Sequence, residues 1–263
     1  MKHIGPMAFN ALRYLLAALC VVPLLLKQSN RTSVRSAKPD ALLVSGSFLA
    51  GIAMFLGAGF QQAGIVYTTA GKAGFITGLY TVFVPLIALI RGEVIKRQTW
   101  FAVALAVSGL YLLSATNSTR INKGDILVLV SALAWAGHVI TIGHFSPKLN
   151  PYALAVGQCL VCSGLSFVGA LFFEKGDFSG APQAWAPIVY AGCFSIGVGF
   201  TLQILGQRHA KTSHAAIIMS LESVFAAIGG WLFLNEVMSG RTISGCALML
   251  CGMVLAQFSA RDA

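Results

Sequence analysis

Long apolar blocks separated by short polar segments run along the whole chain. Each block has about 20 residues, the length that an α-helix needs to cross a hydrocarbon core of roughly 30 Å. The strands of a membrane barrel would instead alternate apolar and polar positions over about ten residues. The pattern therefore predicts nine transmembrane helices, at residues 8–26, 41–61, 71–91, 99–115, 123–143, 152–173, 185–206, 213–234 and 241–259.

The composition also indicates an all-α integral membrane protein. Of the 263 residues, 57% are hydrophobic and only 10% are charged, whereas soluble domains have about 25% charged residues. The polar segments are too short to form a soluble domain, so the lipid bilayer is the expected environment. The net charge is +10, and most of the basic residues lie in loops. We expect them to set the orientation of the chain in the membrane and not to bind nucleic acid.

The distribution of the basic residues predicts an orientation. If the nine segments cross alternately, eleven of the 18 Lys and Arg residues lie on one side and seven on the other. The side richer in positive charge is cytoplasmic in most membrane proteins. We therefore expect a multi-pass protein of the inner (plasma) membrane, with its C-terminus in the cytoplasm. The poorer side holds Lys2, Arg13, Lys72, Arg120, Lys123, Lys175 and Arg241.

An internal repeat relates the two halves of the chain. Residues 59–83 match residues 201–225 at a shift of 142 positions, and a one-residue gap later Gly109 matches Gly252. The copies are an odd number of predicted helices apart, so the second is inverted in the membrane, which is typical of transporters. The identical pairs include Ile76 and Ile218, Leu79 and Leu221, Val82 and Val224, and Phe83 and Phe225.

The two copies are unequal in length. Residues 1–116 contain four predicted helices and residues 117–263 contain five. A counterpart of the helix at 123–143 would precede Met1, so we expect that the chain lacks the first helix of a 5+5 arrangement. The expected fold is thus a 4+5 inverted-repeat bundle.

Several short motifs resemble the two EamA repeats of the drug/metabolite transporter (DMT) superfamily. They are Gly92-Glu93 after the third predicted helix, Asn235-Glu236 after the eighth, the segment 70–77, and Ala134-Trp135-Ala136. The resemblance implies ten helices in two inverted five-helix repeats, a central cavity and export of small metabolites. It does not identify the solute.

Glu222 is the clearest candidate for a functional residue. It is the tenth residue of the predicted helix at 213–234, near the membrane midplane, where a charge costs several kcal/mol unless it is paired, protonated or hydrated. It is either a site for a proton or a cationic substrate group, or a structural hydrogen-bonding carboxyl. Its counterpart in the first copy is Tyr80, and we expect these two side chains to face each other.

Other polar residues in the predicted helices are weaker candidates. Ser131, Trp135 and His138 share one face of the helix at 123–143, and either line the cavity or pack within the bundle. Lys72 and His214 are counterparts in the first turns of their helices. Each either extends its side chain to the membrane surface or attracts anions at a cavity mouth.

Pro85 predicts a kink in the helix at 71–91. Cys159 and Cys162 lie three positions apart, and we interpret them as packing residues. The histidines and carboxylates show no spacing typical of a metal site. We expect no cofactor and no enzyme activity, and the G-x-x-x-x-G-K-[ST] loop of an ATP-driven pump does not occur.

The sequence therefore predicts a secondary-active transporter that exports a small-molecule solute by alternating access, coupled to protons through Glu222. The inverted repeat already supplies internal symmetry, so we expect a monomer. The alternative is a truncated membrane scaffold or subunit that transports nothing.

Overall fold

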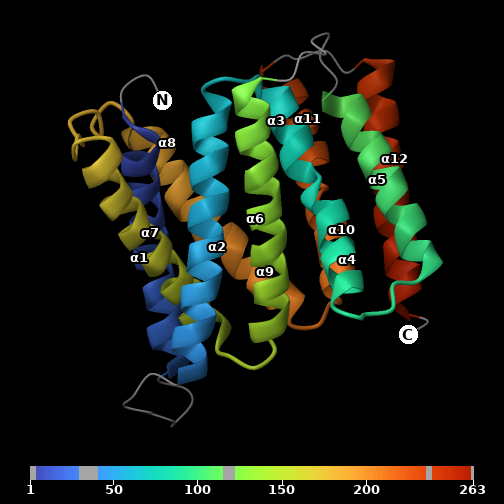
Figure 1. Ribbon diagram of the computed structural model, residues 1–263, viewed down its shortest axis with the longest axis horizontal. Helices are drawn as coiled ribbons and strands as arrows, with labels where there is room; N and C mark the ends of the chain where they lie inside the picture. The colour runs from blue at the N-terminus through green and yellow to red at the C-terminus, as the bar shows by residue number, and fades with distance from the viewer. Residues whose placement is uncertain (1–3, 30–40, 115–121, 235–238, 262–263) are drawn as a thin grey trace. The chain divides into compact units, whose positions relative to one another are not determined.

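All regular structure that the computed structural model describes, in residues 4–29, 41–114, 122–234 and 239–261, is helical (Figure 1). Asn235 and Glu236, which belong to one of the sequence motifs, lie outside these residues. The helices are α1 Pro6–Ser29, α2 Ala41–Ile65, α3 Ala70–Gly78, α4 Tyr80–Ile90, α5 Arg97–Ser114, α6 Lys123–Phe145, α7 Pro151–Phe173, α8 Trp185–Val189, the π-helix η1 Tyr190–Val198, α9 Gly199–Gln207, α10 Thr212–Met219, α11 Glu222–Leu234 and α12 Gly240–Arg261.

Every predicted segment is helical, but three of them are not single α-helices. The predicted helix at 71–91 is divided into α3 and α4, and that at 213–234 into α10 and α11. The segment 185–206 contains η1 between α8 and α9. Among the described residues, seven helical segments are long and apolar enough to cross a membrane, and Gly240–Ala256 is a shorter apolar helix.

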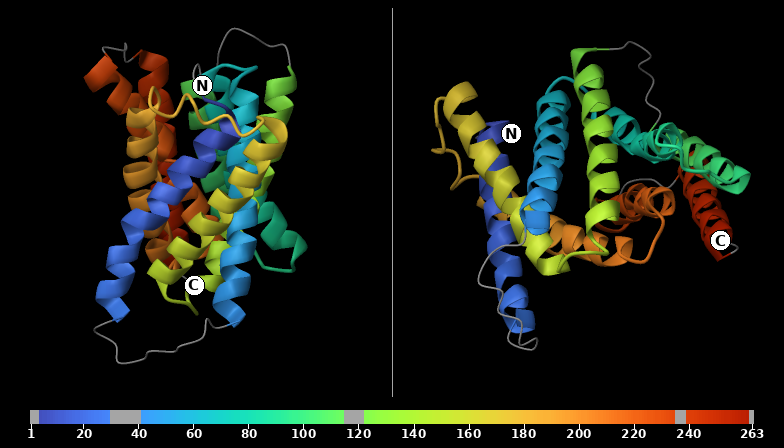
Figure 2. Two further views of the ribbon diagram at one scale, coloured as in Figure 1. Left: turned by 90° about the vertical axis from the view of Figure 1, so that its left-hand side faces the viewer. Right: turned by 60° about the horizontal axis from the view of Figure 1, so that its bottom comes forward.

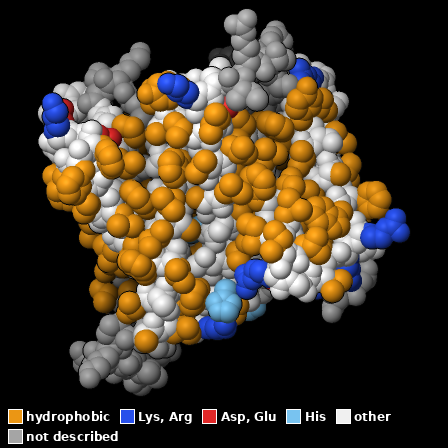
Figure 3. Space-filling view, viewed as in Figure 1, with side chains coloured by type: hydrophobic (Ala, Val, Ile, Leu, Met, Phe, Trp, Pro, Cys, Tyr) orange, Lys and Arg blue, Asp and Glu red, His pale blue; other side chains and the backbone are white. Residues whose placement is uncertain are grey.

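The outer surface of the helices is apolar, as expected for contact with lipid. Phe172, Phe173 and Ile90 are 80%, 82% and 85% exposed, respectively. On the face seen in Figure 3, apolar side chains cover the middle of the helices, and Lys and Arg side chains lie toward the edges. Soluble monomeric proteins rarely expose so much apolar surface. The protein is therefore a multi-pass membrane protein.

The chain forms two compact units, and each unit contains helices from both halves of the sequence. Unit 1 comprises residues 1–62 and 141–209, and unit 2 comprises residues 63–140 and 210–263. Two of the boundaries fall inside α2 and α6, and the third lies between α9 and α10. The compact units are therefore a different division of the chain from the repeat halves 1–116 and 117–263.

In unit 1, α1 packs along α7 (Figures 1 and 2). The hydroxyl of Ser163 on α7 donates a hydrogen bond of 2.8 Å to the carbonyl oxygen of Ala11 on α1. Ala8 and Ala17 on α1 and Ala170 on α7 are fully buried. Small side chains let helix backbones approach closely, which is how membrane helices gain van der Waals contact without a hydrophobic driving force.

Glu174, the residue that follows α7, ties the end of α7 to the start of α1. Its two carboxylate oxygens accept hydrogen bonds from the backbone N–H groups of Met7 and Ala8, at 2.7 and 2.9 Å. The first N–H groups of a helix have no partner within the helix and carry a partial positive charge. A carboxylate from another helix satisfies two of them here.

In unit 2, α5 and α12 lie side by side (Figure 2, right). A Cβ atom at Gly245 would lie 2.8 Å from the carbonyl oxygen of Gly109, and one at Gly252 would lie 2.8 Å from that of Ala102. Only glycine permits this backbone contact. Gly109 and Gly252, which the sequence comparison pairs, therefore take part in the same helix–helix interface.

Candidate functional site

The first interruption in unit 2 separates α3 from α4 at Leu79. The N–H of Leu79 donates to the carbonyl of Ile76 at 3.2 Å, a tight i→i−3 bond. The Leu79 carbonyl then accepts hydrogen bonds from the N–H groups of Val82 and Phe83, at 2.9 and 3.1 Å, which start α4.

The second interruption, between α10 and α11, has the same hydrogen bonds at the counterpart positions. Leu221 donates to Ile218 at 3.1 Å, and its carbonyl accepts from Val224 and Phe225 at 2.9 and 3.0 Å. The Ser220 hydroxyl adds a bond of 2.7 Å to the carbonyl of Ile217. The four residue types that make the shared bonds are identical in the two copies, so similar local sequences form the same interruption twice.

The interruption does not coincide with Pro85, where the sequence predicts a kink. Pro85 lies inside α4, which is continuous from Tyr80 to Ile90. The interruption is at Leu79, less than two helical turns earlier. The second copy is interrupted at the same position although it has Ala227 in the place of Pro85, so proline is not required for the interruption.

Glu222 and Tyr80 each begin the helix that follows an interruption. The position of Glu222 in the first turn of α11 places its carboxylate at the positive end of that helix, which lowers the cost of the charged form. Glu222 is exposed, whereas Tyr80 is buried. Both residues belong to unit 2, and their facing each other stays a prediction.

Two of the three α6 residues singled out from the sequence contact each other, and one of them packs against the interrupted helices. Trp135 and His138 make an edge-to-face contact with ring centroids 5.6 Å apart, and Ser131 and His138 are fully buried. Trp135 packs on an apolar cluster that contains Tyr80. The cluster as a whole joins α4, α6 and α10 through Tyr80, Val84, Ala136, Val139 and Ala216.

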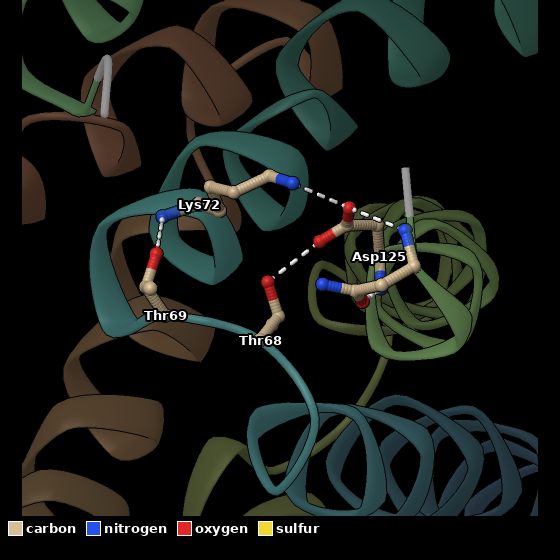
Figure 4. A network of polar contacts seen from close by, with 5 residues as sticks. Thr68, Thr69, Lys72 and Asp125 are labelled. Atoms are coloured by element: carbon tan, nitrogen blue, oxygen red, sulfur yellow. Dashed lines mark hydrogen bonds and ion pairs between the residues drawn. The ribbon is translucent and has the colours of Figure 1, made fainter. Parts of the chain in front are cut away.

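Lys72 forms an ion pair with Asp125 near the starts of α3 and α6 (Figure 4). Its Nζ atom lies 2.6 Å from Oδ2 of Asp125, and the two side chains are 18% and 7% exposed. Thr68 donates to Oδ1 of Asp125 at 2.6 Å, and the backbone N–H of Asn122 donates to Oδ2 at 3.0 Å. The Asp125 carboxylate thus accepts from three donors. Thr68 lies in the segment before α3, and Lys72 lies in α3 itself.

We did not predict this pair. In the predicted topology, Lys72 and Asp125 lie on the same outer side of the membrane, each within a few residues of a helix start. This placement could have identified Asp125 as a candidate partner of Lys72. The charge of Lys72 is compensated by a carboxylate of the same unit, and the two roles expected for Lys72 stay predictions.

His214, the counterpart of Lys72, is buried in the first turn of α10. Its Nε2 atom lies 3.4 Å from the hydroxyl oxygen of the buried Thr99, in the first turn of α5. The start of α10 is therefore linked to α5 by a long, neutral contact, whereas the start of α3 is linked to α6 by a short ion pair.

Arg13 is a further charged residue within a predicted membrane segment. It was counted with the outer residues, but it lies in α1 seven residues after Pro6, about 10 Å along the helix axis. Its guanidinium carbon lies 5.0 Å from the ring centroid of Phe9 and 5.2 Å from that of Tyr14. Cation–π contacts of this kind contribute about 0.5–2 kcal/mol and partly offset the loss of hydration.

Comparison with known proteins supports one family for the whole chain. The model of the EamA-like transporter family matches residues 1–115 and again residues 122–258. An uncharacterized transporter of Archaeoglobus fulgidus is 33% identical over 256 residues, which cover 97% of this chain and 78% of that protein. The uncharacterized transporter YoaV of Bacillus subtilis is 22% identical, over 97% of this chain and 88% of its own.

More distant similarities agree with this assignment. The threonine/homoserine exporter RhtA of Salmonella typhimurium is 27% identical over 160 residues, which are 59% of this chain and 51% of that protein. A solved crystal structure superimposes with a TM-score of 0.79 at 18% identity, and covers 98% of this chain and 89% of that chain. At this identity the superposition shows the fold alone. The chain therefore belongs to the EamA-like transporter family of the drug/metabolite transporter superfamily, and it is a membrane transporter.

Proposed function

We propose that this chain is a secondary-active transporter that exports a small metabolite or drug-like solute across the inner (plasma) membrane by alternating access. Solute movement is coupled to proton movement through Glu222. The observation that carries the proposal is the pair of matching interruptions at Leu79 and Leu221. Interrupted helices near the membrane midplane form the substrate and ion sites of many secondary transporters.

The two interruptions belong to two inverted repeats, residues 1–116 with four helices and residues 117–263 with five. The identical hydrogen bonds and the two separate matches to one family model support this division. The odd number of helices between the copies inverts the second copy. With the basic residues as counted above, the C-terminus is cytoplasmic and the starts of α3 and α6 face outward.

Glu222 has the properties required of a residue that exchanges a proton. The membrane interior favours its neutral form, and the N-terminus of α11 favours its charged form. A small change in the surroundings of the carboxyl therefore shifts the balance between the two. Tyr80, Trp135, His138 and Ser131 complete the proposed solute site, with Trp135 available to stack on a ring or a cationic group.

The ion pair of Lys72 and Asp125 stabilises the outward end of unit 2 in the present conformation. It holds the start of α3 against the start of α6, so a conformation in which these ends separate has to break it. His214 makes the corresponding contact at the start of α10. During alternating access, the protein would thus break a strong contact, Lys72–Asp125, in one repeat and a weak contact, His214–Thr99, in the other.

The test is untargeted metabolite profiling of medium and cells. Cells that produce the wild-type chain are compared with cells that produce Glu222→Gln and with cells that carry an empty vector. Because one relative is a threonine/homoserine exporter, amino acids are the first class to quantify. We expect a solute that accumulates in the medium with the wild type alone. No difference among the three would contradict export and favour a non-transporting scaffold or subunit.

A further inference from the structure

Two thiols from distant parts of the chain meet in unit 1. The Sγ atoms of Cys20 on α1 and Cys193 on η1 lie 3.1 Å apart, and one thiol donates a hydrogen bond to the other. Cys20 is exposed and Cys193 is half-buried. A disulfide has a sulfur–sulfur distance of about 2.05 Å, so the two sulfur atoms need to approach by only about 1 Å.

Close packing of α1 and η1 brings these thiols together. A Cβ atom at Gly192 would lie 2.9 Å from the carbonyl oxygen of Arg13, and one at Gly197 would lie 3.6 Å from the Cβ atom of Cys20. Gly192, next to Cys193, therefore lets η1 lie directly on the backbone of α1, and Gly197 is in van der Waals contact with Cys20. The approach of the thiols follows from the packing of two helices and does not depend on a loop.

The π-helical geometry of η1 makes this contact sensitive to conformation. A π-helix has i→i+5 hydrogen bonds and is rare, and short π-helical segments occur frequently at functional sites. Cys193 is the fourth residue of η1. Conversion of η1 to an α-helix would change the rotation per residue and turn the side chain of Cys193 relative to α1.

We propose that Cys20 and Cys193 form a reversible disulfide when a hydroperoxide oxidises the protein, and that this bond fixes η1 to α1. The hydroperoxide first converts one thiol to a sulfenic acid and is itself reduced to an alcohol, or to water in the case of hydrogen peroxide. The second thiol attacks that sulfur, the S–S bond forms, and water leaves. A dithiol reductant restores both thiols.

The other cysteines lack this geometry or exposure. Cys159 and Cys162 are buried in α7, and Cys246 is buried in α12. Cys251, also on α12, is exposed. Oxidation of Cys251 shows that the oxidant reaches exposed thiols of this protein. No other thiol is in contact with Cys251 among the described residues, so it serves as an internal control.

The test uses the full wild-type chain in membranes treated with cumene hydroperoxide, followed by alkylation of the remaining thiols, tryptic digestion and mass spectrometry. Cleavage after Arg13, Lys27, Lys175 and Arg208 gives peptides 14–27 and 176–208, each with one cysteine. We expect a linked pair of these peptides that disappears after reduction with dithiothreitol. Cys20→Ser is the matched control, and it should abolish the linked pair.

The proposal is overturned if no linked pair forms at a hydroperoxide concentration that oxidises Cys251. It is also overturned if peptide 14–27 links equally to peptides with other cysteines, because the bond would then reflect random collision. Bond formation is measured without any solute, so this outcome is independent of whether the chain exports a metabolite.

A second measurement tests the effect on η1. Hydrogen–deuterium exchange of the amides of residues 190–198 is compared between oxidised and reduced wild type, with Cys20→Ser under the same treatment. We expect slower exchange in the oxidised wild type alone. Equal exchange in the oxidised and reduced forms would contradict the restraint of η1.

Discussion

At Leu79 and at Leu221 the chain leaves one helix and begins the next with the same three backbone hydrogen bonds. The first residue of the new helix, however, is Tyr80 in one copy and Glu222 in the other. The contacts at the preceding helix starts also differ, with the Lys72–Asp125 ion pair in one copy and the His214–Thr99 contact in the other. The copies thus share backbone geometry, whereas their side-chain chemistry has become different.

This difference has a physical reason. The interruption depends on local hydrogen bonds and on a few apolar residues, so it persists wherever those residues are kept. A carboxylate at membrane depth is costly, and a second one close by would add repulsion between like charges. A carboxylate at one of the two counterpart positions and a tyrosine at the other therefore give one titrating carboxyl, where two carboxylates would repel each other.

The largest effect is expected for Glu222→Gln. In proteoliposomes with the solute found by profiling, an imposed pH gradient should drive transport by the wild type but not by this variant, with a loss of at least roughly tenfold. Tyr80→Phe, which changes the counterpart position, should lose much less, because it removes no ionisable carboxyl. Unchanged pH-driven transport by Glu222→Gln would refute the coupling role.

Exchanging the residues at positions 80 and 222 tests whether the carboxylate works equally well in either copy. Tyr80→Glu combined with Glu222→Tyr restores one carboxylate at the start of a half-helix, but in the other copy. We expect this variant to transport more than Glu222→Tyr alone, by roughly tenfold in initial rate. Equal rates for the two variants would show that the positions are not interchangeable, and that the surroundings of α11 matter as much as the carboxyl.

The contacts at the two helix starts should differ in strength. Lys72→Met leaves Asp125 without its ion-pair partner and should lower the free energy of unfolding by about 1–3 kcal/mol. His214→Gln should lower it by less than about 1 kcal/mol, because its contact is long and uncharged. Both values come from unfolding by a denaturing detergent in mixed micelles.

A double-mutant cycle with Lys72→Met and Asp125→Asn isolates the interaction between the two side chains. The cycle of His214→Gln with Thr99→Ala is the matched comparison. A coupling energy at Lys72–Asp125 no greater than that at His214–Thr99 would contradict the proposed difference between the two ends.

The smallest effects are expected at two glycines of α3. Gly78→Ala places a Cβ atom against the side chain of Leu110 on α5 and should destabilise the protein by about 1 kcal/mol. Gly74→Ala meets no atom within 4 Å and should stabilise it by about 0.5–1 kcal/mol, because alanine favours a helix. The same detergent unfolding measures both, and effects of the same sign would contradict the packing of α3 on α5.

Much of the fold was predictable from the sequence because it depends on local properties. The length and apolarity of each block predicted where the helices lie, and identical residues at a constant shift predicted an internal repeat, but not that two of the helices are interrupted. The same shift makes Tyr80 the counterpart of Glu222, and each of the two begins the helix that follows an interruption. Pro85 does not account for the interruption, since the same hydrogen bonds form at Leu221 without a proline.

The contacts between helices were not predictable in the same way. Residues far apart in the sequence formed the Lys72–Asp125 pair, the Glu174 cap on α1 and the meeting of Cys20 with Cys193. The sequence by itself determined which segments are helical and apolar, because hydropathy and backbone hydrogen bonding act over a few turns. Which polar groups lie face to face depends on how closely each pair of helices packs, and this became visible with the three-dimensional arrangement of the helices.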